Sequence, residues 1–167
     1  IEEGLLVQDI MAKHGLKRGV DGLQVYVMAE VPTNIILADR FAKIFDGFSI
    51  GSNDLTQFTL AIDRDAGNLK VAGVSNEKND SVKILIKYLI EVGKKTKTKV
   101  GICGQAPSDF PDFARYLVEC GIDSISLNPD TVIKTTLDLL AYEKKLGAKG
   151  GSSASKSAGK KSLLGRK

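Results

Sequence analysis

Two kinds of hydrophobic pattern alternate along residues 1–147. Short runs of β-branched and aromatic residues predict buried strands at Leu23–Ala29, Phe48–Gly51, Lys99–Cys103 and Ser124–Leu127. Longer stretches with apolar residues three or four positions apart predict helices at Leu5–His14, Pro32–Ile44, Asp80–Thr96, Phe110–Cys120 and Thr131–Lys145. Strands separated by helices indicate βαβ units, and the chain is therefore predicted to form an α/β fold with a parallel sheet.

Four parallel strands of this kind fit two architectures. One is a small doubly wound sheet, and the other is half of a (β/α)8 barrel, which normally needs about 250 residues. Both architectures place ligands at the carboxyl ends of the strands, so the search for a site is the same in either case. A half-barrel would leave two parallel edges exposed, which predicts that two copies pair as a homodimer.

Polar groups follow the predicted strand ends. Glu30 comes directly after the first strand, Gly51-Ser52-Asn53-Asp54 ends the second, and Cys103 ends the third. Mg²⁺ is typically held by one or two carboxylates while substrate oxygens and water complete its shell, and Glu30 with Asp54 fits that description. A zinc site is not predicted, because His14 is the only histidine and the two cysteines lack ligand spacing.

Each of these residues also has a structural interpretation. Glu30 could favour the start of the helix after Pro32 through the helix dipole, and Asp54 could cap a helix that begins at Leu55. Cys103 on a buried strand could be a small apolar filler. The segment 63–65 (Asp-Arg-Asp) could be a solvated turn or a clamp over the site. These alternatives remain open on the spacing alone.

The net charge of +4 is concentrated at the carboxyl end. Residues 151–167 hold five of the 24 Lys and Arg residues and no acid, so the rest of the chain is close to neutral. No basic face with interleaved aromatics is visible, which argues against a nucleic-acid partner. Residues 148–167 have too few apolar side chains to offset chain entropy and are predicted to form a disordered basic tail after a domain at 1–147.

The compartment is also indicated by the sequence. The apolar runs are shorter than the ~18 residues of a membrane span, and no secretion leader opens the chain. Two cysteines are too few for a disulfide framework, which predicts the reduced cytoplasm. The chain begins with Ile1 on a helix-like segment, and we expect it to be a piece of a longer protein.

Three segments together resemble a known family. They are Met28-Ala-Glu-Val-Pro32, Phe45-Asp-Gly-Phe-Ser-Ile-Gly-Ser-Asn-Asp-Leu-Thr-Gln57 and Asp63-Arg64-Asp65. They are similar to the carboxyl-terminal barrel of the phosphoenolpyruvate-utilising enzymes, and the resemblance covers about residues 15–140. Within that family, the segments at 101–109 and 121–130 resemble the synthase members, which are also called "pyruvate, water dikinases". The resemblance implies the carboxyl-terminal half of a (β/α)8 TIM barrel.

The resemblance also implies roles for individual residues. Glu30 and Asp54 would be the ligands of Mg²⁺, and both would contact phosphoenolpyruvate or pyruvate together with Gly51, Ser52 and Asn53. Cys103 would be the acid or base at the methylene carbon. Mg²⁺ would stabilise the enolate of pyruvate as a Lewis acid.

The implied reaction converts pyruvate, ATP and water to phosphoenolpyruvate, AMP and phosphate. It needs a phosphohistidine domain and an ATP-binding domain, which are not in this sequence, so the fragment alone is expected to be inactive. Alternatives are a fragment of pyruvate phosphate dikinase, or of the enzyme through which phosphate enters the sugar phosphotransferase system. A further alternative is a non-catalytic half-barrel that serves in assembly.

Overall fold

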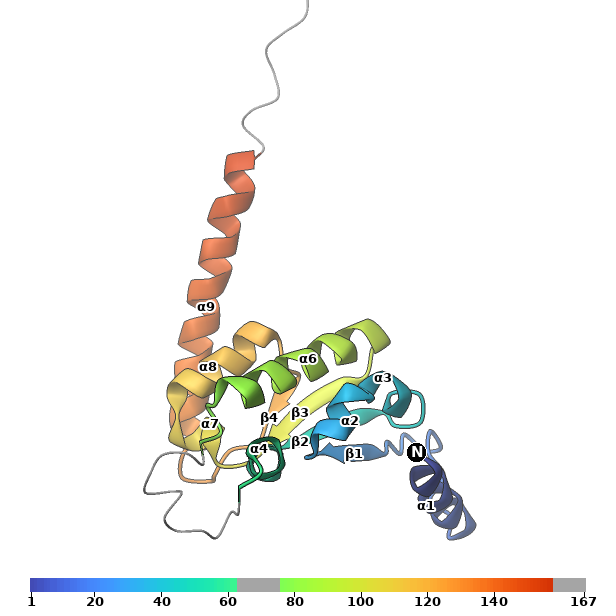
Figure 1. The fold of residues 1–167 in the computed structure, drawn as a ribbon. Coiled ribbons are helices and arrows are strands. Elements are labelled where there is room, and N and C mark those ends of the chain that lie inside the picture. Colours follow the sequence, from blue (N-terminus) through green and yellow to red (C-terminus); the bar gives the residue numbers. More distant parts are fainter. Residues whose placement is uncertain (63–75, 158–167) are drawn as a thin grey trace, which may run out of the picture.

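The computed structural model describes the backbone of residues 1–62 and 76–157, and side chains up to residue 147. Its centre is a four-stranded sheet (Figure 1). The strands are β1 (Tyr26–Ala29), β2 (Gly47–Gly51), β3 (Lys99–Cys103) and β4 (Ser124–Ile125). All neighbouring strands are parallel, and their order in the sheet is the order along the chain.

Helices precede, connect and follow these strands. They are α1 (Glu2–Lys13), α2 (Pro32–Ile36), α3 (Ala38–Phe41), α4 (Ser52–Leu60), α6 (Asp80–Thr96), α7 (Ala106–Asp109), α8 (Pro111–Cys120) and α9 (Val132–Ser157). Figure 1 shows α2, α3, α6 and α8 on one side of the sheet. A doubly wound sheet has helices on both faces and a reversal in strand order. Sequential order with helices on one face is instead the arrangement of a partial (β/α)8 barrel, as predicted.

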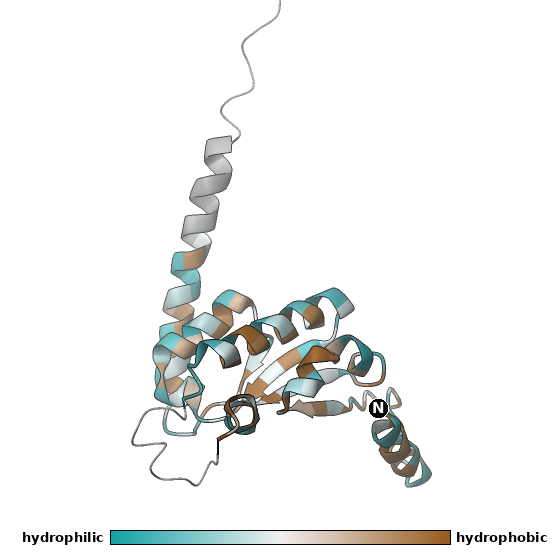
Figure 2. Cartoon of the chain, viewed as in Figure 1, coloured by the Kyte–Doolittle hydropathy of each residue, from teal (hydrophilic) through white to brown (hydrophobic). Residues whose placement is uncertain are grey.

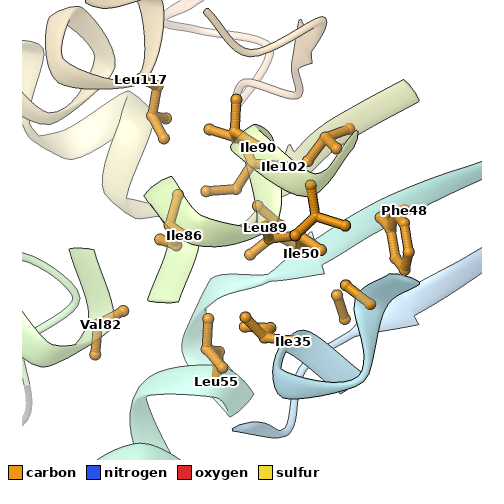
Figure 3. Packing of buried hydrophobic residues seen from close by; sticks show 14 of the residues in the cluster. Ile35, Phe48, Ile50, Leu55, Val82, Ile86, Leu89, Ile90, Ile102 and Leu117 are labelled. Atoms are coloured by element: carbon orange, nitrogen blue, oxygen red, sulfur yellow. The ribbon is translucent and has the colours of Figure 1, made fainter. Parts of the chain in front are cut away.

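The helix-covered side of the sheet carries the hydrophobic core (Figure 3). Phe48 and Ile50 of β2 are fully buried, as is Ile35 of α2. They pack in one cluster with α6, whose buried residues recur at helical spacing: Val82, Ile86, Leu89 and Ile90. Figure 2 shows hydrophobic stretches on the strands and on the helices that cover them. Burial of one such side chain contributes roughly 1.5–3 kcal/mol.

The opposite side of the same strands is different in character. Tyr26 and Met28 of β1 keep about two-fifths of their surface exposed (42% and 41%). Glycines on the central strands leave space for neighbouring side chains: the Tyr26 ring lies where Gly47 would carry a Cβ, and the Ser124 hydroxyl lies 2.5 Å from a Cβ built on Gly101. This side is therefore lined by small, polar and partly exposed groups.

An ion pair at the amino-terminal end of the sheet holds the segment that leads into β1. Arg18 donates to both carboxylate oxygens of Asp46, each at 2.9 Å, and the Val25 amide donates to Asp46 at 2.8 Å. The Arg18 guanidinium is the main cause that lowers the pKa of the Asp46 carboxyl, although burial opposes it. By contrast, α1 lies beside the sheet without a buried residue.

Several predicted boundaries differ from the structure. The single helix predicted at Pro32–Ile44 is two short helices, because Leu37 leaves helical geometry (φ −103°, ψ 22°). The helix predicted from Phe110 begins at Pro111, since a residue before proline is disfavoured in the helical region and Phe110 is extended. The sequence interpretation also missed α7, and it made the first and last strands too long.

The last helix is longer than predicted. The sequence predicts its end at Lys145 and no regular structure from residue 148, but α9 continues to Ser157. Helical hydrogen bonds are made within the segment itself, so a helix can extend without a core, and no proline interrupts this one. Residues 158–167 of the predicted tail lie outside the described residues. Within residues 1–62 and 76–157, no helix is long and apolar enough to span a membrane.

Candidate functional site

The predicted site residues lie at one edge of the sheet. Ala29 pairs with Ile50, and Gly51 pairs with Cys103, so the carboxyl ends of β1, β2 and β3 lie side by side. Glu30 follows β1 directly, and α4 begins one residue beyond Gly51. The parallel register thus gathers groups that lie up to 73 positions apart in the sequence.

Glu30 lies against the end of β2. Its Oε2 is 2.8 Å, and its own Cβ 3.1 Å, from the position that a Cβ on Gly51 would occupy. The absence of a side chain at Gly51 is therefore what allows the Glu30 carboxylate to lie across the strand end. Glu30 is half-buried there, which limits the number of directions that its carboxylate can take.

Asn53 and Asp54 occupy the first turn of α4. The helix starts at Ser52 with Gly51 as its N-cap, and no side chain caps it. Asp54 is therefore the third residue of the helix, and the interpretation that it caps a helix beginning at Leu55 is wrong. The first amides of a helix lack partners within the helix, and its dipole favours a negative group there. Asn53 and Asp54 are both half-buried in this electropositive turn.

Cys103 has a polar neighbour on the adjacent strand. The Ser49 hydroxyl donates to the Cys103 sulfur at 3.4 Å, and the thiol is half-buried on the open side of the sheet. A cysteine that served only as core filler would point to the helix-covered side, as Ile102 does. Sequence reasoning missed Ser49, although its place two residues before Gly51 puts it on the same face as the site.

Ser52 is fully buried, and its hydroxyl donates to Glu77. The same hydroxyl oxygen lies 3.5 Å from the Cys103 carbonyl oxygen. Ser52 therefore connects the end of β2 to the end of β3 and to the turn before α6. Glu77 was not among the predicted site residues, because nothing in its local sequence marks it.

The remaining histidine and cysteine side chains lie away from this cluster. His14 caps the carboxyl end of α1, and Cys120 ends α8, where it packs against the core. The segment 63–65, considered as a clamp, lies outside the described residues.

The side chains at this edge of the sheet include possible ligands for Mg²⁺. Within the described part of the chain, no group of three or more His, Cys, Asp or Glu side chains could hold a metal on its own. Glu30, which follows β1, and Asp54, in the first turn of α4, both offer hard oxygen ligands. Mg²⁺ commonly takes one or two such ligands while substrate and water supply the rest. Glu30 and Asp54 therefore have the ligand chemistry of a Mg²⁺ site that substrate would complete.

Comparison with known proteins gives a family and a set of relatives. The family model described as "PEP-utilising enzyme, PEP-binding domain" matches residues 7–143. The chain is 62% identical over 146 residues to phosphoenolpyruvate synthase of Aquifex aeolicus (strain VF5), which covers 87% of this chain and 17% of that protein. It is 59% identical over 146 residues to the synthase of Synechocystis sp. (87% and 18%), and 50% identical over 144 residues to that of Escherichia coli K12 (86% and 18%). The chain thus spans less than a fifth of the length of these relatives.

Proposed function

The chain belongs to the PEP-binding domain family of the PEP-utilising enzymes, and from this premise we propose that it is the phosphoenolpyruvate- and pyruvate-binding part of a phosphoenolpyruvate synthase. The observation that carries the proposal is the gathering of Glu30, Gly51 and Cys103 at adjacent strand ends, within the segment that the family model matches. The whole reaction forms phosphoenolpyruvate, AMP and phosphate from pyruvate, ATP and water. Its phosphohistidine and ATP-binding domains would lie elsewhere in the longer cytoplasmic protein.

The substrate would bind at the first turn of α4. Pyruvate and phosphoenolpyruvate are anions, and the amides of Ser52 and Asn53 can donate to their oxygens while the helix dipole favours their charge. The Asn53 carboxamide adds a side-chain donor in the same turn. Because the Ser52 hydroxyl already donates to Glu77, we assign the contact with substrate to the Ser52 backbone.

Glu30 and Asp54 would hold Mg²⁺, which when bound withdraws charge from the substrate oxygens as a Lewis acid. The Glu30 carboxylate would bind the ion from its position across Gly51 at the end of β2. Cys103 would remove a proton from the methyl carbon of pyruvate and return it in the reverse direction. Ser49 holds the sulfur on the open side of the sheet, where that carbon would lie.

A hybrid enzyme tests the proposal. In it, this chain replaces the matched 146-residue segment of the A. aeolicus synthase, which supplies all other domains. We expect AMP formation that depends on both pyruvate and ATP. The double variant Glu30→Ala/Asp54→Ala should lower this rate by about 10³-fold, since Lewis-acid stabilisation contributes several kcal/mol.

The matched control is Asp39→Ala/Glu91→Ala, which removes two exposed acids from α3 and α6. It should keep the parental rate. A folded hybrid without pyruvate-dependent AMP formation would contradict the synthase proposal. Parental activity in the Glu30→Ala/Asp54→Ala variant would contradict the metal assignment while leaving the synthase proposal intact.

A further inference from the structure

Glu77 extends the site in a direction that the strand ends do not indicate. It lies in the turn before α6, and its half-buried carboxylate accepts a hydrogen bond from the Ser52 hydroxyl at the start of α4. Ser52 itself has no exposed surface. A charged acceptor makes this one of the stronger classes of hydrogen bond, and it is shielded from water on the Ser52 side.

The turn that carries Glu77 is ordered by hydrogen bonds among residues 76–81. Asn76 accepts the Lys78 amide on its side chain at 2.8 Å and the Asn79 amide on its carbonyl at 2.9 Å. Asn79 in turn caps α6 by accepting the Ser81 amide at 2.9 Å.

Lys78 ties the same turn to α8. Its ammonium lies 3.4 Å from Asp112 and 4.3 Å from the centroid of the Phe110 ring. Glu77 is thus presented to Ser52 from a turn that is fixed on two helices, rather than from a free loop.

The backbone at the end of β3 packs closely against the hydrogen bond between Ser52 and Glu77. Gly104 has φ +151°, and a Cβ on it would collide with the Ser52 hydroxyl oxygen and lie 3.3 Å from Glu77 Oε1. The Cys103 carbonyl oxygen is 3.5 Å from the same hydroxyl. Glu77, Ser52 and the backbone of Cys103 and Gly104 therefore form one packed unit directly behind the thiol.

We propose that Glu77 is a positioning residue that locks the first turn of α4 against the end of β3 through Ser52. This lock sets the distance between the Cys103 thiol and the Asn53–Asp54 turn. The role of those groups in catalysis rests on the proposed function, whereas the lock itself can be tested without it.

Alkylation of the two cysteines in this 167-residue chain tests the lock directly. Glu77→Ala should raise the rate of Cys103 labelling by iodoacetamide about tenfold, because loss of a charged hydrogen bond favours local opening of the Cys103–Gly104 turn. Cys120, at the end of α8, provides the internal control and should keep its rate. Mass spectrometry of the two peptides gives both rates from one sample.

Four further variants make the test specific to the hydrogen bond between Glu77 and Ser52. Glu77→Gln retains a side-chain oxygen that can accept from Ser52, so it should label at close to the parental rate. Ser52→Ala should label like Glu77→Ala, and the double variant should be no faster than either single variant. Glu91→Ala removes an exposed glutamate of the same helix region and should match the parent.

An unchanged labelling rate of Cys103 in Glu77→Ala would overturn the lock. Equal increases in the labelling rates of Cys103 and Cys120 would also overturn it, because they would indicate a general loss of stability.

In the hybrid enzyme, Glu77→Ala should lower kcat about tenfold with an unchanged KM for ATP, and Glu77→Gln should restore kcat. Fast labelling with parental kcat would overturn the positioning role. An inactive parental hybrid would count against the proposed function alone, since labelling still decides the lock.

Discussion

The two sides of the sheet are made by the same strands but have opposite compositions. Phe48 and Ile50 point into the helix-covered core, and neither has more than a trace of exposed surface. Ser49 and Gly51, which alternate with them, face the open side and contact Cys103 and Glu30. Stability and proposed chemistry are thus carried by alternate residues of one five-residue strand. The two sides should respond differently to substitution.

The largest expected difference is between two adjacent residues of β2. Phe48→Ala should lower the free energy of unfolding by about 3–5 kcal/mol, because it removes a fully buried ring from the core. Ser49→Ala should lower it by less than about 1 kcal/mol, because Ser49 is only partly buried. Urea denaturation followed by circular dichroism measures both changes.

Ile50→Val is the milder version of the core substitution, at about 0.5–1.5 kcal/mol, and it gives a measurable transition if Phe48→Ala leaves the chain unfolded. Equal destabilisation by Phe48→Ala and Ser49→Ala would contradict the division between the two sides.

A second prediction concerns the open side alone. Gly51 has an ordinary φ of −85°, so alanine fits the backbone there, but its Cβ would meet Glu30 Oε2 at 2.8 Å. Gly51→Ala should therefore displace the carboxylate and lower the activity of the hybrid enzyme by about 10–100-fold, with a higher requirement for Mg²⁺.

Its matched control is Gly147→Ala on α9, where a Cβ would meet nothing within 4 Å. A Mg²⁺ titration of AMP formation compares the two variants and the parent. The same Mg²⁺ requirement in all three proteins would show that the Glu30 carboxylate does not depend on the open space at Gly51.

The smallest effect is expected at the far end of the sheet. The pKa of Asp46 is lowered by Arg18, so the folded state binds its proton less tightly than the unfolded state does. The pair therefore stabilises the fold above the ordinary pKa of an aspartate, about 3.9, and this contribution is lost as the pH falls through the lower folded value.

Arg18→Ala should cost about 1 kcal/mol at pH 7, and the difference from the parent should shrink below about pH 4. Urea denaturation at pH 7 and pH 3 provides the comparison. Lys13→Ala, which removes an exposed pair with Asp9, should show no measurable change at either pH. A difference between Arg18→Ala and the parent that is constant with pH would contradict this assignment.

The sequence predicted the parts of the fold that depend on local periodicity. The long helix Asp80–Thr96 and the strand Lys99–Cys103 were predicted with the bounds that the structure has. The break at Leu37 was not predicted, because apolar residues continue across it at helical spacing. The short helix α7 was missed, since four residues are too few to show a period.

The site residues also fall into a group that the sequence predicted and a group that it did not. Glu30, the segment 51–54 and Cys103 were found because each follows a strand, and parallel strands bring their ends together. Ser49 and Glu77 were not found. Ser49 looks like any small strand residue, and Glu77 reaches Ser52 from 25 positions away through a turn whose position only the folded core defines.

The glycines at both ends of β2 link occupancy of the site to the stability of the strand. The strand begins and ends with glycine, a residue with little tendency to form strands, so Phe48 and Ile50 must hold it in the sheet. A ligand that binds at its carboxyl end adds to that hold, and at a hundred times its Kd it would add about 2.7 kcal/mol. Loss of that ligand would then favour local opening of β2, and locally opened segments are the ones that proteases reach.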